Sequence, residues 1–271
     1  MIKSYAPGRA VLLGDGVEGP ALFIAIEQGI LLSGSRRDND EILVYARDIP
    51  ATYEGSLRRL EPSAEKPWAD PLLAVFSVFR RKGLPVGGAN LTIQSDLPAG
   101  EGLGGPAALA SAAVLFLHRA FAPDQPEPDA AALAHLVQEA LQEFAPGPVA
   151  LADTLSPFFG RAGHAARIEK GSEEIEYLPL PAGASFVIAP VDGDENRRED
   201  ARVEAGAEAL RRGDAAAFGA LLADAGREGM VPIQMIDAGR EPQFLKALNA
   251  ALPGVSCLCT QAAAAARVDG Y

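Results

Sequence analysis

The sequence of 271 residues is poor in cysteine and histidine, two side chains that bind transition metals. It holds two cysteines, Cys257 and Cys259, which lie two positions apart with no further cysteine to complete a metal site. The three histidines, His118, His135 and His164, are scattered along the chain. This pattern argues against a cysteine-based metal centre and predicts buried structural thiols at the two cysteines.

Basic residues are also in short supply, with 24 lysines and arginines against 36 acidic residues and a net charge of -12. This balance argues against binding to nucleic acid or to an anionic membrane. Any site for a polyphosphate must have a positive local electrostatic potential despite the negative net charge of the chain. The sequence shows no signal-peptide pattern at its start and no apolar run as long as a membrane span. We therefore expect a cytoplasmic protein. The composition leaves its oligomeric state open.

Apolar residues are abundant, at 48% of the chain, so a substantial core can form. The clearest break in composition is the Ala-Pro-Gly-Pro segment at 145–148, which predicts an N-terminal lobe at 1–147 and a C-terminal lobe at 148–271. Hydrophobic patterning predicts strands at 10–13, 21–27, 30–35, 41–46, 90–94, 165–169, 174–179 and 185–190. It predicts helices at 71–82, 107–121, 129–144, 198–211, 215–228 and 242–251.

Residues 95–108 are the most informative stretch, because glycines separate the expected strand at 90–94 from the expected helix at 107–121. Glycine has no Cβ, so the backbone can take positive φ and approach a ligand closely. The glycines are Gly100, Gly102, Gly104 and Gly105. The helix N-terminus adds unpaired N–H groups and the positive end of its dipole, and Pro106 suits the first helical position. This combination is typical of a phosphate site.

Several interpretations of this stretch remain open. In the first, the glycines serve only to turn a strand into a helix. Their spacing also satisfies the dinucleotide fingerprint, but residues 95–98 separate them from the strand and a proline-rich segment at 122–129 follows the helix, so the Rossmann context is absent. No Gly-Lys-Ser/Thr follows the glycines, which excludes a Walker-type loop.

The remaining interpretation is a resemblance to a family. Residues 97–108, Leu-Pro-Ala-Gly-Glu-Gly-Leu-Gly-Gly-Pro-Ala-Ala, resemble the second motif of the GHMP kinases, Pro-x-Gly-x-Gly-Leu-Ser/Gly-Ser-Ser-Ala-Ala. Residues 6–15, Ala-Pro-Gly-Arg-Ala-Val-Leu-Leu-Gly-Asp, are similar to the opening of galactokinases. Residues 159–165 and 208–219 resemble two later galactokinase segments. Because the motifs occur in the right order, the chain is identified as a member of the GHMP superfamily, most like galactokinase, with degraded motifs and a shortened C-terminal lobe.

The resemblance implies a two-lobed α+β GHMP kinase fold. Its N-terminal lobe would be ribosomal-protein-S5-like and bind the nucleotide, its C-terminal lobe would be ferredoxin-like, and the active site would lie between them. The implied activity is ATP- and Mg²⁺-dependent phosphorylation of a hydroxyl group on a small sugar or polyol. Asp153 matches the catalytic aspartate, and Arg9 matches the arginine that steadies this carboxylate and the transferring phosphate. Asp15 and Glu18 preserve the acidic character of the substrate-binding segment. The implied phosphate-binding residues are Pro98, Gly100, Gly102, Leu103, Gly104, Gly105 and Ala107.

Plainer roles for the two catalytic candidates stay open. Asp153 can be the N-cap of a helix that begins at Thr154, and Arg9 can be a solvated surface arginine. The second motif also departs from the family, because Gly105 and Pro106 replace the paired serines whose hydroxyls normally help to hold Mg²⁺ and phosphate. The resemblance identifies no metal ligand in this chain.

The third motif departs furthest. The family is glycine-rich there, whereas residues 259–267 contain five consecutive alanines, which cannot adopt the backbone conformations open to glycine. Glu195 also stands where galactokinases carry a sugar-contacting tyrosine. These departures keep a second function open, a catalytically impaired galactokinase-like pseudoenzyme that binds a nucleotide, a sugar or a partner protein.

Overall fold

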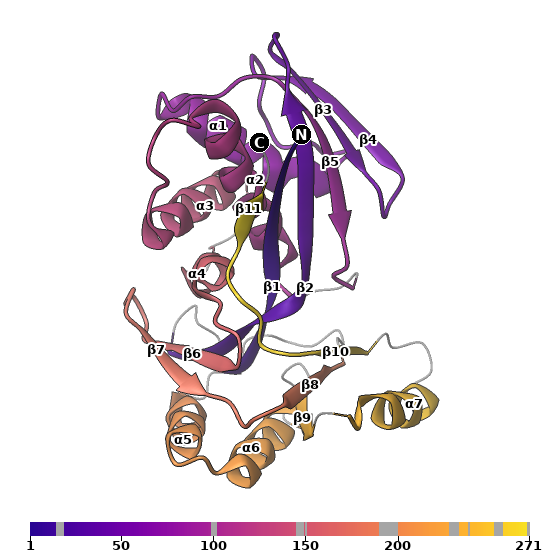
Figure 1. Cartoon of the computed structure of the whole chain (residues 1–271), viewed down its shortest axis with the longest axis vertical. Helices are drawn as coiled ribbons and strands as arrows, with labels where there is room; N and C mark the ends of the chain where they lie inside the picture. The colour runs from indigo at the N-terminus through magenta and orange to yellow at the C-terminus, as the bar shows by residue number, and fades with distance from the viewer. Residues whose placement is uncertain are drawn as a thin grey trace.

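The computed structural model describes residues 1–14, 19–98, 102–144, 149, 151–189, 200–227, 233–237, 239–251 and 257–269 (Figure 1). The elements are, in chain order, β1 (Ile2–Gly14), β2 (Ala21–Arg36), β3 (Glu41–Ala46), β4 (Ala51–Ser56), η1 (Pro67–Ala69), α1 (Asp70–Arg81), β5 (Ala89–Ser95), α2 (Gly105–Phe121), α3 (Ala130–Phe144), α4 (Leu151–Phe159), β6 (His164–Ile168), β7 (Ile175–Pro179), β8 (Ala184–Ile188), α5 (Asp200–Arg211), α6 (Ala215–Arg227), β9 (Ile233–Asp237), α7 (Glu241–Ala251), β10 (Leu258–Thr260) and β11 (Arg267–Asp269). The expected α+β class is confirmed.

Two long antiparallel strands, β1 and β2, form the spine of the molecule (Figure 1). The large sheet has the order β11-β1-β2-β5-β3-β4, and the β6–β7 hairpin joins it at the start of β2. The sequence predicts two short strands at 21–27 and 30–35, but the structure has one strand. Pro7 lies opposite Gly29 and Arg9 lies opposite Ala25, so β2 carries extra residues at a bulge. A bulge bends a strand without ending it, which explains the interrupted pattern.

Helices α1 to α4 pack together over one face of the large sheet and enclose the first core (Figure 1). Helix α2 is buried along nearly its whole length, and its many alanines let its backbone approach the sheet closely. The Ser4 hydroxyl of β1 donates a hydrogen bond to the Ala112 carbonyl of α2 over 2.7 Å. This bond satisfies a buried hydroxyl and ties the central helix to the spine.

A second core lies at the other end of the spine. Leu13 of β1 and Leu22 of β2 pack there with Val203 of α5 and Phe218 of α6, all essentially buried. The small sheet β10-β8-β9 contributes Phe186. Because β1 and β2 supply side chains to both cores, residues near the middle of these strands lie between the two.

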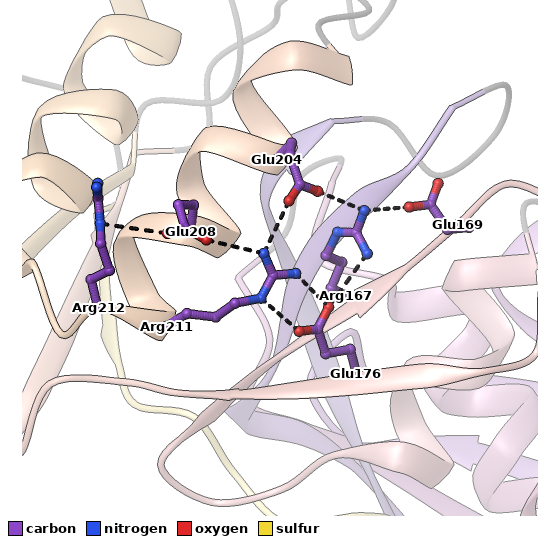
Figure 2. A network of polar contacts seen from close by, with 7 residues as sticks. All are labelled: Arg167, Glu169, Glu176, Glu204, Glu208, Arg211 and Arg212. Carbon is purple, nitrogen blue, oxygen red and sulfur yellow. Dashed lines mark hydrogen bonds and ion pairs between the residues drawn. The ribbon is translucent and has the colours of Figure 1, made fainter.

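A network of ion pairs attaches α5 to the β6–β7 hairpin, as Figure 2 shows. Arg211 of α5 donates two hydrogen bonds of 2.9 Å to the carboxylate of Glu176 of β7. Arg167 of β6 bonds Glu204 of α5 over 2.8 Å. A two-pronged arginine–carboxylate pair has fixed geometry, so the network orients the helix as well as attracting it.

The expected domain boundary at 145–148 lies outside the described residues, and the division into lobes 1–147 and 148–271 stays a prediction. In the described structure α4 packs against α3 and α2, and the C-terminal strand β11 pairs with β1. The expected strands do not include β4, β9, β10 and β11, which are short or weakly alternating. Helix α4 is expected only as the open alternative of a helix beginning at Thr154; it begins at Leu151, so Asp153 lies in its first turn and is not its N-cap. No helix in the described ranges has the length and apolar character needed to cross a membrane.

We expect Glu176→Gln to lower the free energy of unfolding at pH 7 by no more than about 1 kcal/mol, because the carboxylate is 39% exposed and partly screened by water. Hydrogen bonds from Arg211 hold the pKa of Glu176 below its ordinary value. The stabilisation is therefore present above the ordinary carboxyl pKa, and it is lost as pH falls through the lower folded-state value.

Urea unfolding of wild type and variant between pH 3 and 7 measures this difference. The control is Glu174→Gln on the same hairpin, an exposed residue whose side chain makes no ion pair with the described part of the chain. Equal stability of Glu176→Gln and wild type at pH 7 would contradict the prediction.

Candidate active site

The glycine loop has the backbone conformation that its sequence predicts. Gly102 and Gly104 have φ values of 92° and 72°, in the region that glycine occupies most readily. Helix α2 begins at Gly105, two residues earlier than expected, so Pro106 is its second residue and not its first. Within the described structure, the N–H groups of Gly105 and Ala107 have no hydrogen-bond partner. The loop therefore presents backbone donors and a helix dipole to an anion.

The loop is docked onto β1 next to Arg9. The Arg9 N–H donates to the Leu103 carbonyl over 2.9 Å, while the Leu103 side chain is buried in the second core. A Cβ on Gly8 would lie 2.7 Å from the same carbonyl, and a Cβ on Gly104 would lie 2.9 Å from Cγ of Arg9. Both glycines are thus required for the close approach, and the loop and Arg9 form one unit.

Arg9 forms an ion pair with Asp153, which lies in the first turn of α4. The side chains are 13% and 27% exposed, so the pair is held by its surroundings and is still accessible to a small molecule. The Nε atom of Arg9 is buried and has no hydrogen-bond partner among the described residues. The structure thus brings together the two catalytic candidates, which are far apart in sequence, beside the glycine loop.

Burial raises the pKa of Asp153 above its ordinary value, and the neighbouring Arg9 guanidinium opposes this rise. Desolvation disfavours a charged carboxylate, whereas a guanidinium in contact favours it. The result is a carboxylate of increased basicity that is still paired with a cation. Such a group is suited to accept a proton from a bound hydroxyl.

The other predicted site residues divide into two groups. Pro98 is half-buried at the start of the loop, and Ala107 is buried in the first turn of α2. Gly100, Asp15 and Glu18 lie outside the described residues, so their phosphate-binding and substrate-binding roles stay predictions. The segment around Glu195 lies outside the described residues as well.

Comparison with known proteins agrees with this architecture. Residues 71–161, which include the glycine loop and Asp153, match the family described as GHMP kinases N terminal domain. The galactokinase of Thermococcus kodakarensis is 29% identical over 190 residues, which are 69% of this chain and 52% of that protein. A Haemophilus influenzae galactokinase is 29% identical over 225 residues, 78% of this chain and 58% of that protein. Residues 71–161 therefore form a GHMP kinase N-terminal domain, and the chain is galactokinase-like in sequence.

Solved structures share the fold of this galactokinase-like chain. The Lactococcus lactis galactokinase complexed with galactose superposes with a TM-score of 0.81 at 15% identity and covers 98% of this chain and 95% of that one. The Methanococcus jannaschii mevalonate kinase superposes with a TM-score of 0.67 at 15% identity and covers 97% and 98% of the two chains. The chain spans about half the length of the curated galactokinases that it matches in sequence.

The described residues of this galactokinase-like chain do not fit a preformed Mg²⁺ site. No group of three or more His, Cys, Asp or Glu side chains that could hold a metal lies within the described ranges. Asp153, the carboxylate of the pair beside the loop, is already bound to Arg9. Mg²⁺ prefers oxygen ligands in octahedral geometry, and this arrangement offers too few of them.

Two features of this galactokinase-like chain could not be predicted from the sequence. Gly8 and Gly160 are needed for close packing, and only the fold shows which backbone approaches them. Cys257 and Cys259 are partly exposed and not buried as expected. Cys259 lies on β10, an edge strand of the small sheet, and Cys257 directly precedes this strand. Partial burial still raises the pKa of both thiols.

Gly104→Ala and Gly105→Ala are a matched pair that tests the loop geometry. We expect Gly104→Ala to lower the free energy of unfolding by about 1–2 kcal/mol, because alanine is strained at positive φ and its Cβ would meet Arg9. A Cβ on Gly105 meets nothing within 4 Å, and Gly105 is the first residue of helix α2, where alanine is favourable. Gly105→Ala should therefore leave the free energy of unfolding unchanged or slightly raised. Urea unfolding of both variants measures the difference, and equal stabilities would contradict the docked loop.

Proposed function

We propose that this chain is an ATP-dependent, galactokinase-like kinase that phosphorylates a hydroxyl group of a small sugar or polyol. The observation that carries the proposal is the partly exposed ion pair of Arg9 and Asp153 beside the glycine loop. Phosphoryl transfer needs aligned reactants, neutralised charge and a partner for the hydroxyl proton, and it needs little covalent help from the protein. The loop would align the phosphates, Arg9 would neutralise their charge, and Asp153 would take the hydroxyl proton.

ATP, when bound, would supply the transferable phosphoryl group and ADP as the leaving group. The N–H groups of Gly105 and Ala107, which have no hydrogen-bond partner among the described residues, would donate to its phosphate oxygens. The buried Nε of Arg9 has no partner in the described structure and offers a further donor to an oxyanion. These donors would bind the phosphates without the side-chain hydroxyls that the loop lacks. We therefore propose that the nucleotide binds, but weakly.

Asp153 would act on the acceptor. Its carboxylate accepts the proton of the attacking hydroxyl as the new O–P bond forms and the bond to ADP breaks, and the proton then passes to solvent. The raised pKa of Asp153 favours this role, because a more basic carboxylate accepts a proton more readily. Arg9 keeps the carboxylate ionised in the resting site and limits its movement.

The acceptor class is proposed from the relatives, which are named galactokinases. Mg²⁺ is proposed only as an ion that enters with the nucleotide, since the described residues form no site of their own for it. The pseudoenzyme alternative gains no support from the similar proteins, and a module that only binds has no need of the Arg9–Asp153 pair.

We expect ATP with Mg²⁺ to raise the melting temperature. A ligand at ten times its Kd stabilises the folded state by about 1.4 kcal/mol, and for a protein of this size this raises Tm by about 3–6 °C. AMP with Mg²⁺ is the control, because it lacks the β- and γ-phosphates that the loop would bind. An unchanged Tm at millimolar ATP would show that the nucleotide site is not functional.

Asp153→Asn tests the catalytic role. We expect the phosphoryl-transfer rate to fall by about two to four orders of magnitude, because asparagine keeps the shape and cannot accept the proton. Nucleotide binding should survive, since its donors lie on the loop and Arg9. The wild-type rate should fall as pH drops through the pKa of Asp153, which lies above the ordinary carboxyl value of 3.8.

A kinase assay over a panel of sugars and polyols measures this effect. The control is Asp70→Asn, a first-turn aspartate of α1 whose carboxylate accepts a hydrogen bond from the Ser63 N–H over 2.8 Å. Transfer that persists undiminished in Asp153→Asn would mean that another residue takes the proton.

A further inference from the structure

The C-terminal segment runs through both cores and passes the candidate active site. It begins as β10, which pairs with β8 in the small sheet, and it ends as β11, which pairs with β1 in the large sheet. Between them lie the five alanines at 262–266, which we call the alanine strap. No described residue other than glycine has a positive φ, so the described strap has no left-handed loop.

The first half of the strap is bound to β2. Ala262 forms a bridge with Ile26, and the Ala263 N–H donates to the Ala25 carbonyl over 2.8 Å. Ala25 is the residue of β2 that lies opposite Arg9 in the register. This end of the strap therefore fixes the part of the sheet that carries Arg9.

The second half of the strap is bound to α4. The Ala266 N–H donates to the Pro157 carbonyl over 2.6 Å. A Cβ on Gly160, directly after α4, would lie 2.6 Å from Cβ of Ala25 and 3.2 Å from the Ala263 carbonyl. Helix α4, the strap and β2 thus meet at one closely packed point.

Helix α4 needs this external support. Pro157 lies inside the helix and has no N–H, so the Asp153 carbonyl loses its partner four residues along. The Ser156 hydroxyl approaches that carbonyl only at 3.5 Å. A short helix interrupted by proline is weak by itself, and its position relative to β1 must come from tertiary contacts.

We propose that the alanine strap is a positioning element that holds Asp153 of α4 against Arg9 of β1. Its N–H groups at Ala263 and Ala266 already donate to protein carbonyls, so these donors are not available to a phosphate. The strap links the β2 residue opposite Arg9 to the helix that carries Asp153. This inference rests on the proposed kinase function for its catalytic consequence, and its structural part stands apart from it.

Ala266→Pro removes the donor to Pro157 and is the main test. We expect kcat to fall by about 10- to 100-fold, since a displacement of about 1 Å at a reacting group has a cost of this size. The KM for ATP should change by less than about threefold, and the acidic limb of the kcat–pH profile should shift as the surroundings of Asp153 change.

Two control variants isolate the hydrogen bond. Ala266→Gly keeps the N–H and should behave like wild type. Ala264→Pro places a proline in the same strap at an exposed residue whose N–H has no partner in the described structure, and it should retain wild-type kcat. A raised KM for ATP with unchanged kcat in Ala266→Pro would overturn the proposal, because it would assign the strap to nucleotide binding.

A second measurement does not depend on activity. Amide hydrogen exchange in α4 should become faster in Ala266→Pro than in wild type or Ala264→Pro, and the carboxyl pKa of Asp153, followed by NMR, should move. If wild type transfers no phosphate to any acceptor, the kinase proposal fails and the exchange and pKa data still decide the role of the strap. Wild-type exchange and pKa in Ala266→Pro would overturn it.

If Ala266→Pro does not fold, Gly160→Ala provides the same test by a milder route. The added Cβ presses on Ala25 and the Ala263 carbonyl, and it should displace α4 from the strap while leaving every hydrogen-bonding group in place. A lower kcat and faster exchange in α4 support the proposal. Wild-type values for both would overturn it.

Discussion

The contact between Arg9 and Asp153 is the constraint on which the arrangement of this molecule depends. The two residues lie far apart in sequence, on a strand and on a proline-containing helix, and they meet in a partly buried place. Burial is unfavourable for the Asp153 carboxylate, as its raised pKa shows. The pair therefore persists because the surrounding structure holds both partners in place.

Glycines and alanines support the Arg9–Asp153 contact in different ways. Gly8 and Gly104 let the loop lie directly on β1, because a Cβ at either position would collide with a carbonyl or with the Arg9 side chain. The alanines at 262–266 have no positive φ, and the N–H groups of Ala263 and Ala266 donate to carbonyls of β2 and α4. Alanine has less conformational freedom than glycine, so a segment that needs no positive φ is stiffer when built from alanine.

The arginines of the chain serve two different roles, at the glycine loop and between α5 and the β6–β7 hairpin. The chain has a net charge of -12, yet Arg9 is placed at the loop where an anion would bind. Arg167 and Arg211 are used differently, since each is surrounded by glutamates that bind α5 to the β6–β7 hairpin (Figure 2). An arginine with several carboxylate partners is a structural link. Arg9 forms an ion pair with one carboxylate among the described residues, so more of its guanidinium donors are available to a ligand.

The sequence by itself determined the α+β class, the helix that follows the glycines and the likeness to galactokinases, and it singled out Arg9 and Asp153 as candidates, because these depend on local periodicity and short motifs. Tertiary structure alone decided that the two residues meet, that β2 is one bent strand, and that the alanine strap crosses β2 and α4. The short strands β10 and β11 form by pairing with β8 and β1. A short stretch of sequence does not identify a pairing partner that lies more than fifty residues away. The buried place of Asp153 likewise comes from elements packed around it, which no window of sequence contains.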